Sequence, residues 1–227
     1  MYLQLGWARV DGIHYTFLFG GVIVVAVVCA AAYKTSMNIR RAKASKLADD
    51  LDMELLASDN PHTLIVAGEI NDRPSTIRYQ HERTSLEQVR SGGANKSSSA
   101  QEDLLISVQC ECEIEFKISK LAPPQQAGTD LISVALLSSN GLSLESKQKE
   151  KAAFIFEEPE TVRNLIELFE RSGACSLTVG ENKVSVLIID ADDTGKSPAK
   201  VAAILESLDK FARLLEFVAG EHHAIDN

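Results

Sequence analysis

An apolar run near the N-terminus limits what this chain can fold into more than any other feature. From Ile13 to Tyr33 the sequence reads IHYTFLFGGVIVVAVVCAAAY. It contains no Asp, Glu, Lys or Arg, and its only histidine is His14. A helix rises 1.5 Å per residue, so about 20 apolar residues cross a hydrocarbon core of about 30 Å. Tyr15 and Tyr33 lie near the two ends, where amphipathic rings favour the membrane interface. The sequence therefore predicts a transmembrane helix over residues 13–33.

The charges that flank this run predict its orientation. Five cations follow it without any acidic residue between positions 34 and 46: Lys34, Arg40, Arg41, Lys43 and Lys46. Only Arg9 and Asp11 precede it. Because cytoplasmic flanks carry the excess of Lys and Arg, residues 1–12 are expected outside and the rest of the chain in the cytoplasm.

Two other fates of the N-terminal segment compete with a retained anchor. Ala30-Ala31-Ala32 resembles a signal-peptidase site, and Cys29 could suggest lipidation. A basic region before the apolar run is nearly absent, the cations after it oppose translocation, and Val28 replaces the small residue expected before a lipidated cysteine. The prediction is a single-pass anchor, with cleavage as a signal peptide the leading alternative.

The charge of the remaining chain excludes one class of partner. The whole chain has 23 basic and 32 acidic residues. Six of the basic residues and one of the acidic residues precede position 47, so the rest carries 17 against 31, a net charge of −14. Such a field repels polyanions, and nucleic acid is therefore not an expected partner. Four cysteines are too few for a disulfide framework and suit a reducing compartment.

The segments after the anchor predict a helical linker followed by a domain. Residues 34–58 contain neither Gly nor Pro and are expected to prolong the helix until Asp59-Asn60-Pro61. A cytoplasmic domain is predicted over residues 59–220. It opens with two strand-like runs, residues 62–70 and 75–83, joined by a turn with Asn71-Asp72 at its tip. Residues 91–101, SGGANKSSSAQ, are predicted to be a flexible loop.

The stretch ISVQCECEIEFKIS, residues 106–119, holds two cysteines one residue apart. Apolar residues and cysteines alternate strictly with polar residues there, which predicts a half-buried strand with Cys110 and Cys112 facing the core. Glu111, Glu113 and Glu115 would lie on the outer face, where they and the apolar surroundings would raise a thiol pKa. A core role is the interpretation and a redox or metal role the alternative, since Cys175, His62 and His81 complete no recognisable metal spacing.

Further elements follow in the second half of the chain. Apolar runs at residues 130–137 and 152–158 are expected to be strands, and a helix is predicted from Glu158 to Gly173. A hairpin over Gly180-Glu181-Asn182 follows. The last helix is predicted over residues 198–219, ahead of a disordered tail at 221–227. Its apolar stripe consists of Val201, Leu205, Leu208, Phe211, Ala212, Leu215 and Val218.

Strands in bunches with helices after them predict an α+β class: one N-terminal transmembrane helix, then a cytoplasmic antiparallel sheet with two covering helices. About seven strands closed by a C-terminal helix resemble the pleckstrin-homology-like fold. That resemblance implies a possible variant of the fold and licenses no function.

The motif DADDTGKS, residues 190–197, is the most tempting candidate site. Gly195-Lys196-Ser197 matches the end of a phosphate-binding loop, but Asp190 stands at its first glycine position and Asp192 and Asp193 would repel phosphate. The same carboxylates imitate a calcium loop, yet Val201 replaces the bidentate glutamate. Asp190, Asp192 and Asp193 are therefore weak metal candidates, and a solvated linker is the default.

No catalytic set and no cofactor site are predicted. The histidines are scattered, and no nucleophile, base and orienting group fall together in a recognised spacing. The leading hypothesis is a membrane-anchored cytoplasmic interaction or assembly module with a protein partner in or at the membrane. The alternatives are a membrane-held domain for a small ligand or lipid headgroup and, third, an enzyme with a site invisible in sequence.

Overall fold

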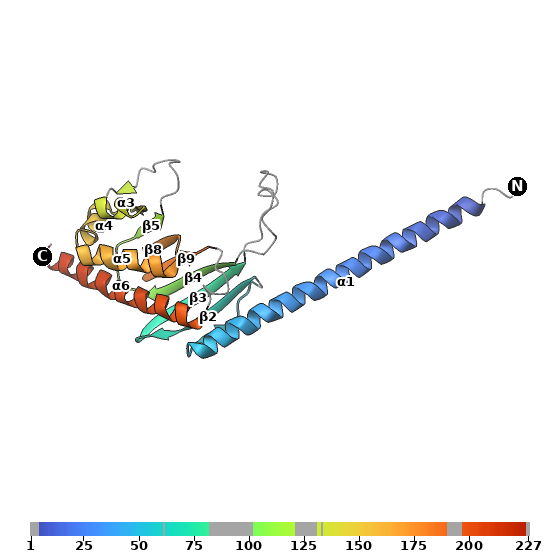
Figure 1. Cartoon of the computed structure of the whole chain (residues 1–227), viewed down its shortest axis with the longest axis horizontal. Helices are drawn as coiled ribbons and strands as arrows, with labels where there is room; N and C mark the ends of the chain where they lie inside the picture. The colour runs from blue at the N-terminus through green and yellow to red at the C-terminus, as the bar shows by residue number, and fades with distance from the viewer. Residues whose placement is uncertain are drawn as a thin grey trace. The chain divides into compact units, whose positions relative to one another are not determined.

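Helix α1 (Leu5–Asp50) opens the computed structural model, which describes residues 5–60, 62–81, 102–120, 131–132, 134–189 and 197–225 (Figure 1). The chain divides into two units, residues 1–44 and residues 45–227. The predicted flexible loop, residues 91–101, lies outside the described residues.

The described residues of the first unit are helical, and their apolar side chains from Val22 to Val28 are exposed. Six residues are 61–64% exposed: Val22, Ile23, Val24, Val25, Val27 and Val28. The described part of α1 from Gly21 has a mean hydropathy of 1.7 in its apolar window and none of that window is buried. By length and composition this helix could cross a membrane, as the sequence predicts.

The helix does not continue to residue 58, so that part of the linker prediction is wrong. It ends at Asp50, and Asp52 takes a left-handed conformation with φ 55°. The Met53 N–H donates to the Ala48 carbonyl at 2.8 Å and the Asp52 N–H to the Asp49 carbonyl at 3.4 Å, which is the Schellman pattern. An aspartate can provide this stop without glycine or proline, and strand β1 (Glu54–Leu56) follows at once.

The second unit is built on one antiparallel sheet in the order β1-β2-β3-β4-β9-β8-β5-β7-β6. The strands not yet given are β2 (Thr63–Ile70), β3 (Arg73–His81), β4 (Glu102–Gln109), β5 (Phe116–Lys120), β6 (Leu131–Ile132), β7 (Leu142–Glu145), β8 (Ser176–Gly180) and β9 (Lys183–Ile188). The α+β class with an antiparallel sheet is therefore confirmed. This unit begins at Ser45, not at the predicted residue 59, because β1 pairs with β2.

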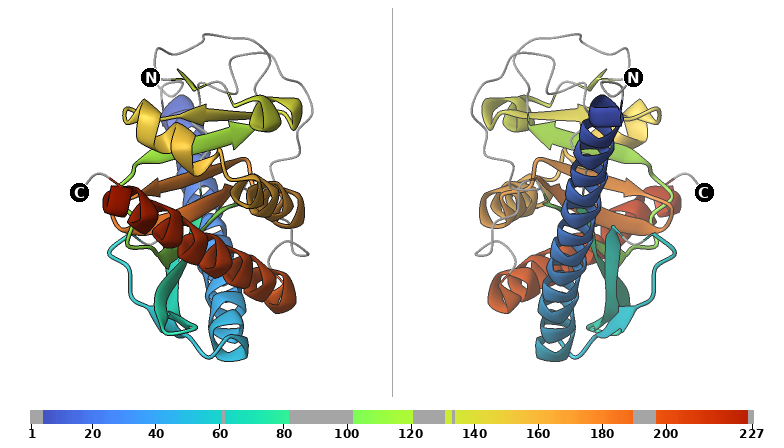
Figure 2. Two further views of the ribbon diagram at one scale, coloured as in Figure 1. Left: turned by 90° about the vertical axis from the view of Figure 1, so that its left-hand side faces the viewer. Right: turned by 90° about the vertical axis from the view of Figure 1, so that its right-hand side faces the viewer.

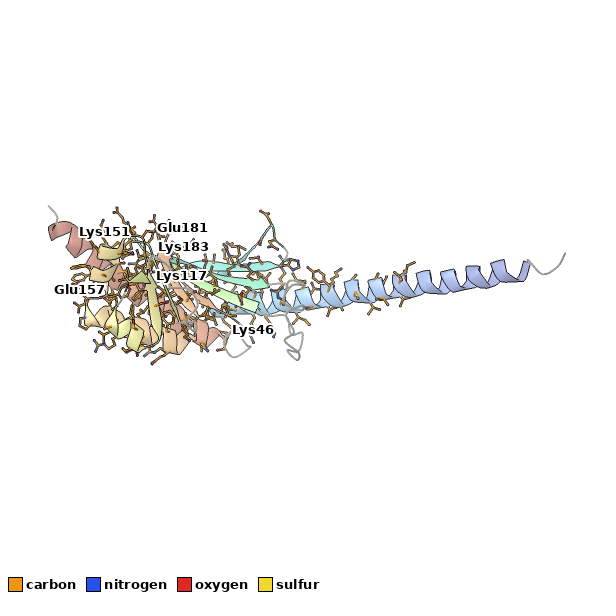
Figure 3. All side chains as sticks on the ribbon, turned by 90° about the horizontal axis from the view of Figure 1, so that it is seen from above. Lys46, Lys117, Lys151, Glu157, Glu181 and Lys183 are labelled. Atoms are coloured by element: carbon orange, nitrogen blue, oxygen red, sulfur yellow. The ribbon has the colours of Figure 1, made fainter. Side chains whose placement is uncertain are left out.

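Both predicted hairpins are present. Asn71 and Asp72, with φ 51° and 66°, connect β2 to β3, and Glu181 and Asn182, with φ 52° and 56°, connect β8 to β9. Two consecutive residues at positive φ form the type I′ turn, whose twist matches that of antiparallel strands. Lys183 and Glu181 form an exposed ion pair of 2.6 Å at the second turn (Figure 3).

The alternating stretch 106–119 is not one strand. Its burial alternates as predicted from Val108 to Ile118, whereas Ser107 is buried at 6% exposure. The chain leaves β4 after Gln109 and enters β5 at Phe116. Strands β9 and β8 lie between β4 and β5 in the sheet. Residues 110–115 therefore pass the tip of the β8–β9 hairpin, where the Cys110 N–H donates to the Asn182 carbonyl at 2.9 Å.

Of the two apolar runs predicted as strands, the first is part strand and part helix, and the second is mainly helical. Residues 130–137 give the short strand β6 and the start of helix α3 (Ala135–Ser139), and residues 152–158 contain most of α4 (Lys149–Ile155). Ala152, Ile155 and Phe156 are buried at i, i+3 and i+4. A short continuous apolar run does not distinguish a strand from a buried helix, which explains the error.

Helices α5 (Pro159–Ser172) and α6 (Pro198–Ile225) pack together, and α6 contacts β2, β4 and β9 (Figure 2). Every residue of the predicted α6 stripe is buried, at 0–6% exposure, so α6 covers the sheet with the predicted face. Gly173 ends α5 with φ 70°, as predicted. Helix α6 continues through Gly220 to Ile225, so residues 221–225 are not a disordered tail. One glycine costs only about 1 kcal/mol in a helix and does not by itself end one.

Candidate functional site

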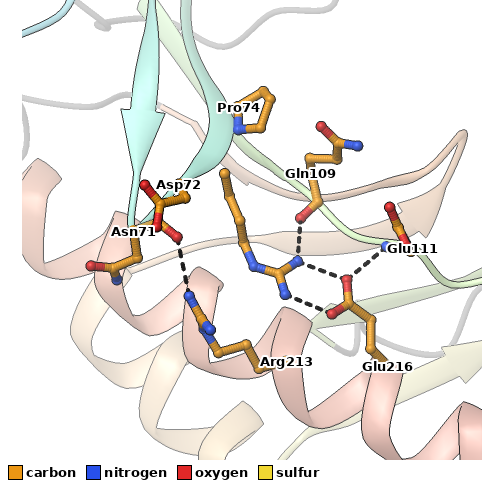
Figure 4. Close-up of a pocket in the computed structure, with 8 residues that line it drawn as sticks. Asn71, Asp72, Pro74, Gln109, Glu111, Arg213 and Glu216 are labelled. Atoms are coloured by element: carbon orange, nitrogen blue, oxygen red, sulfur yellow. Dashed lines mark hydrogen bonds and ion pairs between the residues drawn. The ribbon is translucent and has the colours of Figure 1, made fainter.

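A polar cleft lies where the β2–β3 turn approaches α6 (Figure 4). It has a volume of about 400 Å³ and is lined by Asn71, Asp72, Arg73, Pro74, Gln109, Glu111, Arg213 and Glu216. Asp209, Arg213 and Glu216 occupy positions i, i+4 and i+7 of α6, so their side chains share one face of the helix. Helix, hairpin and the chain after β4 thus supply one group of charges.

Asp209 is the buried anion of this group. Its side chain is 4% exposed and lies 3.0 Å from the Arg73 Nε and 3.2 Å from the Arg213 Nε. The Asn71 Nδ2 donates a further hydrogen bond to Asp209 Oδ2 at 2.7 Å. A buried carboxylate is tolerated only when it is paired and hydrogen-bonded, and here both oxygens are satisfied by three side chains.

Glu216 forms the second contact between α6 and the sheet. The Arg73 Nη1 and Nη2 donate to its two carboxylate oxygens at 2.7 and 2.6 Å, a bidentate arrangement. The backbone N–H of Glu111 donates to Glu216 Oε1 at 2.8 Å, and the Arg73 Nη1 also donates to the Gln109 carbonyl at 3.1 Å. One arginine therefore joins the start of β3, the end of β4 and helix α6.

The electrostatics of the cleft follow from these contacts. The hydrogen bonds from Arg73 hold the pKa of the Glu216 carboxyl below its ordinary value, and the Glu111 N–H acts in the same direction. Glu216 in turn raises the pKa of Arg73. Both shifts stabilise the charged forms, as expected of an ion pair that is stable at neutral pH.

The arrangement is suited to fixing structure and not to reaction chemistry. Both arginines of the cleft, Arg73 and Arg213, are already held by carboxylates of the same chain. General acid–base work needs a group with a pKa near neutrality, whereas the Glu216 pKa is shifted away from it. The cleft therefore holds the β2–β3 hairpin against α6.

Two cysteines adjoin the cleft. Cys110 is 0% and Cys112 4% exposed, and the Cys110 thiol lies 3.7 Å from the Ala212 carbonyl on α6. Both thiols face the core as predicted. The interaction with the Cys112 thiol, together with burial, raises the pKa of Cys110. The interaction with the Cys110 thiol lowers the pKa of Cys112, opposite to the predicted rise.

The structure brings few of the other predicted candidates together. Asp190, Asp192 and Asp193 lie outside the described residues, so their weak metal role stays a prediction. Among the residues whose side chains the structure describes, no three His, Cys, Asp or Glu are grouped to hold a metal ion. Cys175 contacts the Leu187 carbonyl at 3.2 Å, in another part of the sheet.

Sequence reasoning missed the group formed by Arg73, Asp209 and Glu216. One local signal was available, since Asp209 stands directly after Leu208 and before the apolar pair Phe211-Ala212 in the predicted stripe. A carboxylate in such a position requires a cation. The partner, Arg73, is more than a hundred residues away in sequence, and no spacing rule connects the two.

Comparisons with known proteins assign no family. No protein-family model matches the chain, and no curated protein matches it. Among solved structures, the crystal structure of the mycobacterial trehalose monomycolate transport factor A, TtfA, aligns with a TM-score of 0.46 and 8% sequence identity. The alignment covers 78% of this chain and 92% of that one. This likeness is too distant to give the chain a family or a function.

Proposed function

We propose that this chain is a single-pass membrane protein whose α+β domain is a cytoplasmic interaction or assembly module. The observation that carries the proposal is the exposure of the apolar α1 side chains from Val22 to Val28. The Val and Ile side chains in this segment are 61–64% exposed. A row of such side chains is costly in water and stable in lipid. Residues 15–33 contain no charged residue, which supports a span over 13–33.

The orientation proposed is N-terminus outside and domain in the cytoplasm. It is supported by the five cations from Lys34 to Lys46, since Lys and Arg concentrate on the cytoplasmic flank. A retained anchor is proposed over a cleaved signal peptide for the same reason. The net charge of −14 from residue 47 onward further supports a domain held away from anionic lipid.

An interaction role for the domain is supported by the internal pairing of its cleft. Arg73 and Arg213 are occupied by Asp209 and Glu216, so the cleft offers a ligand few uncommitted donors. The alternative function, binding of a small ligand or lipid headgroup by a pleckstrin-homology-like variant, needs clustered cations free to bind anions. The described cleft favours the interaction module over that alternative.

Thiol labelling tests the topology. In a variant with its native cysteines replaced, Glu170→Cys places a thiol on an exposed position of α5, and Gln4→Cys places one before the span. An impermeant maleimide applied to intact cells is expected to label the Gln4→Cys protein and to label the Glu170→Cys protein only after lysis. Labelling of Glu170→Cys in intact cells would overturn the orientation, and an N-terminus sequenced after Ala32 would overturn the anchor.

Purification from membranes tests the interaction role. The full chain, extracted in mild detergent and captured through a C-terminal tag, is expected to retain a defined protein at fixed stoichiometry. The matched control is residues 1–44 fused to an unrelated soluble domain, which should not retain that protein. Glycerophosphoserine and inositol phosphates are expected to leave the melting temperature of the purified chain unchanged. A dose-dependent rise in melting temperature would instead support the headgroup-binding alternative.

A further inference from the structure

The cleft between the β2–β3 turn and α6 has its donors committed but leaves acceptors free. Both of its arginines are held by carboxylates of the same chain. The side chains of Asp72, Gln109 and Glu111 also line the cleft, and all three residues are exposed (Figure 4). Within the described part of the chain, no hydrogen bond or ion pair holds these three side chains. The cleft therefore favours a ligand that supplies hydrogen-bond donors over one that supplies acceptors.

The charges of the cleft give the sign of that ligand. The two internal carboxylates balance the two arginines, which leaves Asp72 and Glu111 uncompensated and the cleft negative. The chain from residue 47 onward carries a net charge of −14, which attracts cations over a longer range. A Lys or Arg side chain supplies hydrogen-bond donors and positive charge together.

An exposed aromatic ring adjoins this negative cleft. Phe217 is 63% exposed on α6. It directly follows Glu216 and stands four residues after Arg213, and both of these line the cleft, so the ring and the cleft occupy neighbouring parts of the helix surface. Aromatic side chains are enriched in protein–protein interfaces. A free amine would fill the cleft and leave the ring in water, whereas a protein segment covers both.

From these observations we propose that the cleft and Phe217 form a docking surface for a basic segment of a partner protein. A Lys or Arg side chain of the partner occupies the cleft against the carboxylates of Asp72 and Glu111, and a neighbouring apolar side chain packs on the Phe217 ring. The cleft volume of about 400 Å³ accommodates one long side chain. This inference rests on the interaction role proposed above and deepens it, since it names the surface and the chemistry of the partner.

The surface can be changed without disturbing the fold. Asp72→Asn keeps a residue suited to the positive φ of 66° in the β2–β3 turn. Glu111→Gln keeps the backbone N–H that donates to Glu216. Each of these variants removes one negative charge with little change of shape. Phe217→Ala removes a side chain that is mostly in water, so the melting temperature should stay close to that of the wild type.

Photo-crosslinking in cells that make the full chain identifies what covers this surface. p-Benzoylphenylalanine replaces Phe217, and the crosslinked product is analysed by mass spectrometry. The expected product is a protein segment with Lys or Arg residues next to the crosslinked position. The same photo-reactive residue in place of Glu206, exposed on α6 three turns earlier, is the control and should not reach that segment. A product on lipid, on a second copy of this chain or on a segment without cations would overturn the proposal, as would the absence of a product.

Affinity for the crosslinked segment measures the two parts of the surface. The segment, made as a labelled peptide, is titrated with the detergent-solubilised full chain. The double variant Asp72→Asn with Glu111→Gln is expected to weaken binding at least about tenfold, and Phe217→Ala about tenfold. Glu206→Gln, which removes one negative charge elsewhere on α6, is the control and should leave the affinity unchanged. Unchanged affinity in the double variant would overturn the proposal, and so would spermidine that competes as well as the unlabelled peptide.

The outcomes also separate this inference from the proposed function. A partner that co-purifies with the full chain but binds the double variant and Phe217→Ala as tightly as the wild type would overturn the docking surface and leave the interaction role intact. A full chain that retains no protein in that purification would overturn both.

Discussion

Helices α1 and α6 are both long and rich in apolar residues, yet the apolar segment of α1 from Val22 to Val28 and the apolar stripe of α6 have opposite environments. In α1 the residues from Val22 to Val28 include six that are 61–64% exposed. In α6 all seven residues of the stripe from Val201 to Val218 are 0–6% exposed. The apolar residues of α1 from Val22 to Val28 cover every side of the helix, while the stripe of α6 occupies one side and leaves Glu206, Lys210 and Arg213 exposed.

This difference shows that the spacing of apolar residues decides which solvent a helix requires. A helix with one apolar stripe can cover a sheet and keep its charges in water, as α6 does. A helix that is apolar all round has no face for water and needs either a protein interior or lipid. The following changes test the comparison, beginning with the largest expected effect.

The α6 stripe should be essential to the domain. Phe211 is fully buried and is among the largest such side chains, so Phe211→Ala is expected to reduce the free energy of unfolding by about 3–5 kcal/mol. Urea denaturation of residues 45–227 measures the change. Phe217→Ala is the matched control, since Phe217 is 63% exposed on the same helix and should change stability by less than about 0.5 kcal/mol. Equal losses from both variants would contradict the observed face of α6.

The acidic residues of α6 should differ in how much they contribute to the free energy of unfolding. Asp209→Ala removes a carboxylate that is 4% exposed and leaves the Asn71 amide and the guanidinium groups short of an acceptor. Breaking a buried pair in this way is expected to cost about 3–4 kcal/mol. Glu206→Ala, at an exposed position one turn earlier, is the control and should be nearly neutral. A small effect of Asp209→Ala in the same denaturation experiment would mean that the contacts with Arg73 and Arg213 contribute little.

How much of the fold can be predicted from the sequence depends on how far apart in the sequence the interacting residues are. The α6 stripe, the end of α5 at Gly173 and both type I′ turns follow from local patterns, and all are present. The split of residues 106–119 between β4 and β5 does not follow from a local pattern, because polar and apolar residues alternate in the same way on either side of the break. Where each strand pairs is decided by β8 and β9, some sixty residues later.

The candidate site was less predictable than the fold for the same reason. Arg73 and Glu216 come from opposite ends of the domain and meet only when α6 lies on the sheet. The stop of α1 at Asp50 was missed because it depends on a left-handed Asp52, a conformation that only some aspartates adopt. Cys110 and Cys112 were correctly placed in the core, but the backbone hydrogen bond from the Cys112 N–H to the Cys110 carbonyl, which closes a turn after β4, was not predicted.

For α1, a charge in the middle of the apolar segment should oppose insertion. Val25→Lys is expected to make the apparent free energy of membrane insertion less favourable by about 2.5–3.5 kcal/mol, the cost of a lysine near a helix centre. A microsomal insertion assay with glycosylation tags measures it. Ser36→Lys, beyond the apolar run and among native cations, is the control and should have little effect. Equal effects at both positions would mean that residues 13–33 do not form the span.

The smallest effect expected on this comparison is at Glu216, where α6 meets the β2–β3 hairpin. Glu216→Gln should reduce the free energy of unfolding by about 1–2 kcal/mol at pH 7, because a charge-assisted bidentate pair becomes a neutral one. The pKa of Glu216 is lowered in the folded state, so its contribution is present above the unfolded pKa of about 4.3 and is lost as pH falls through the folded pKa. The difference between wild type and variant in urea denaturation should therefore shrink below about pH 4.

Glu167→Gln is the control, since the Glu167–Arg171 pair is 49% and 63% exposed and should contribute no more than about 0.5 kcal/mol. A difference for Glu216→Gln that is independent of pH would show that the glutamate acts by shape and not by charge.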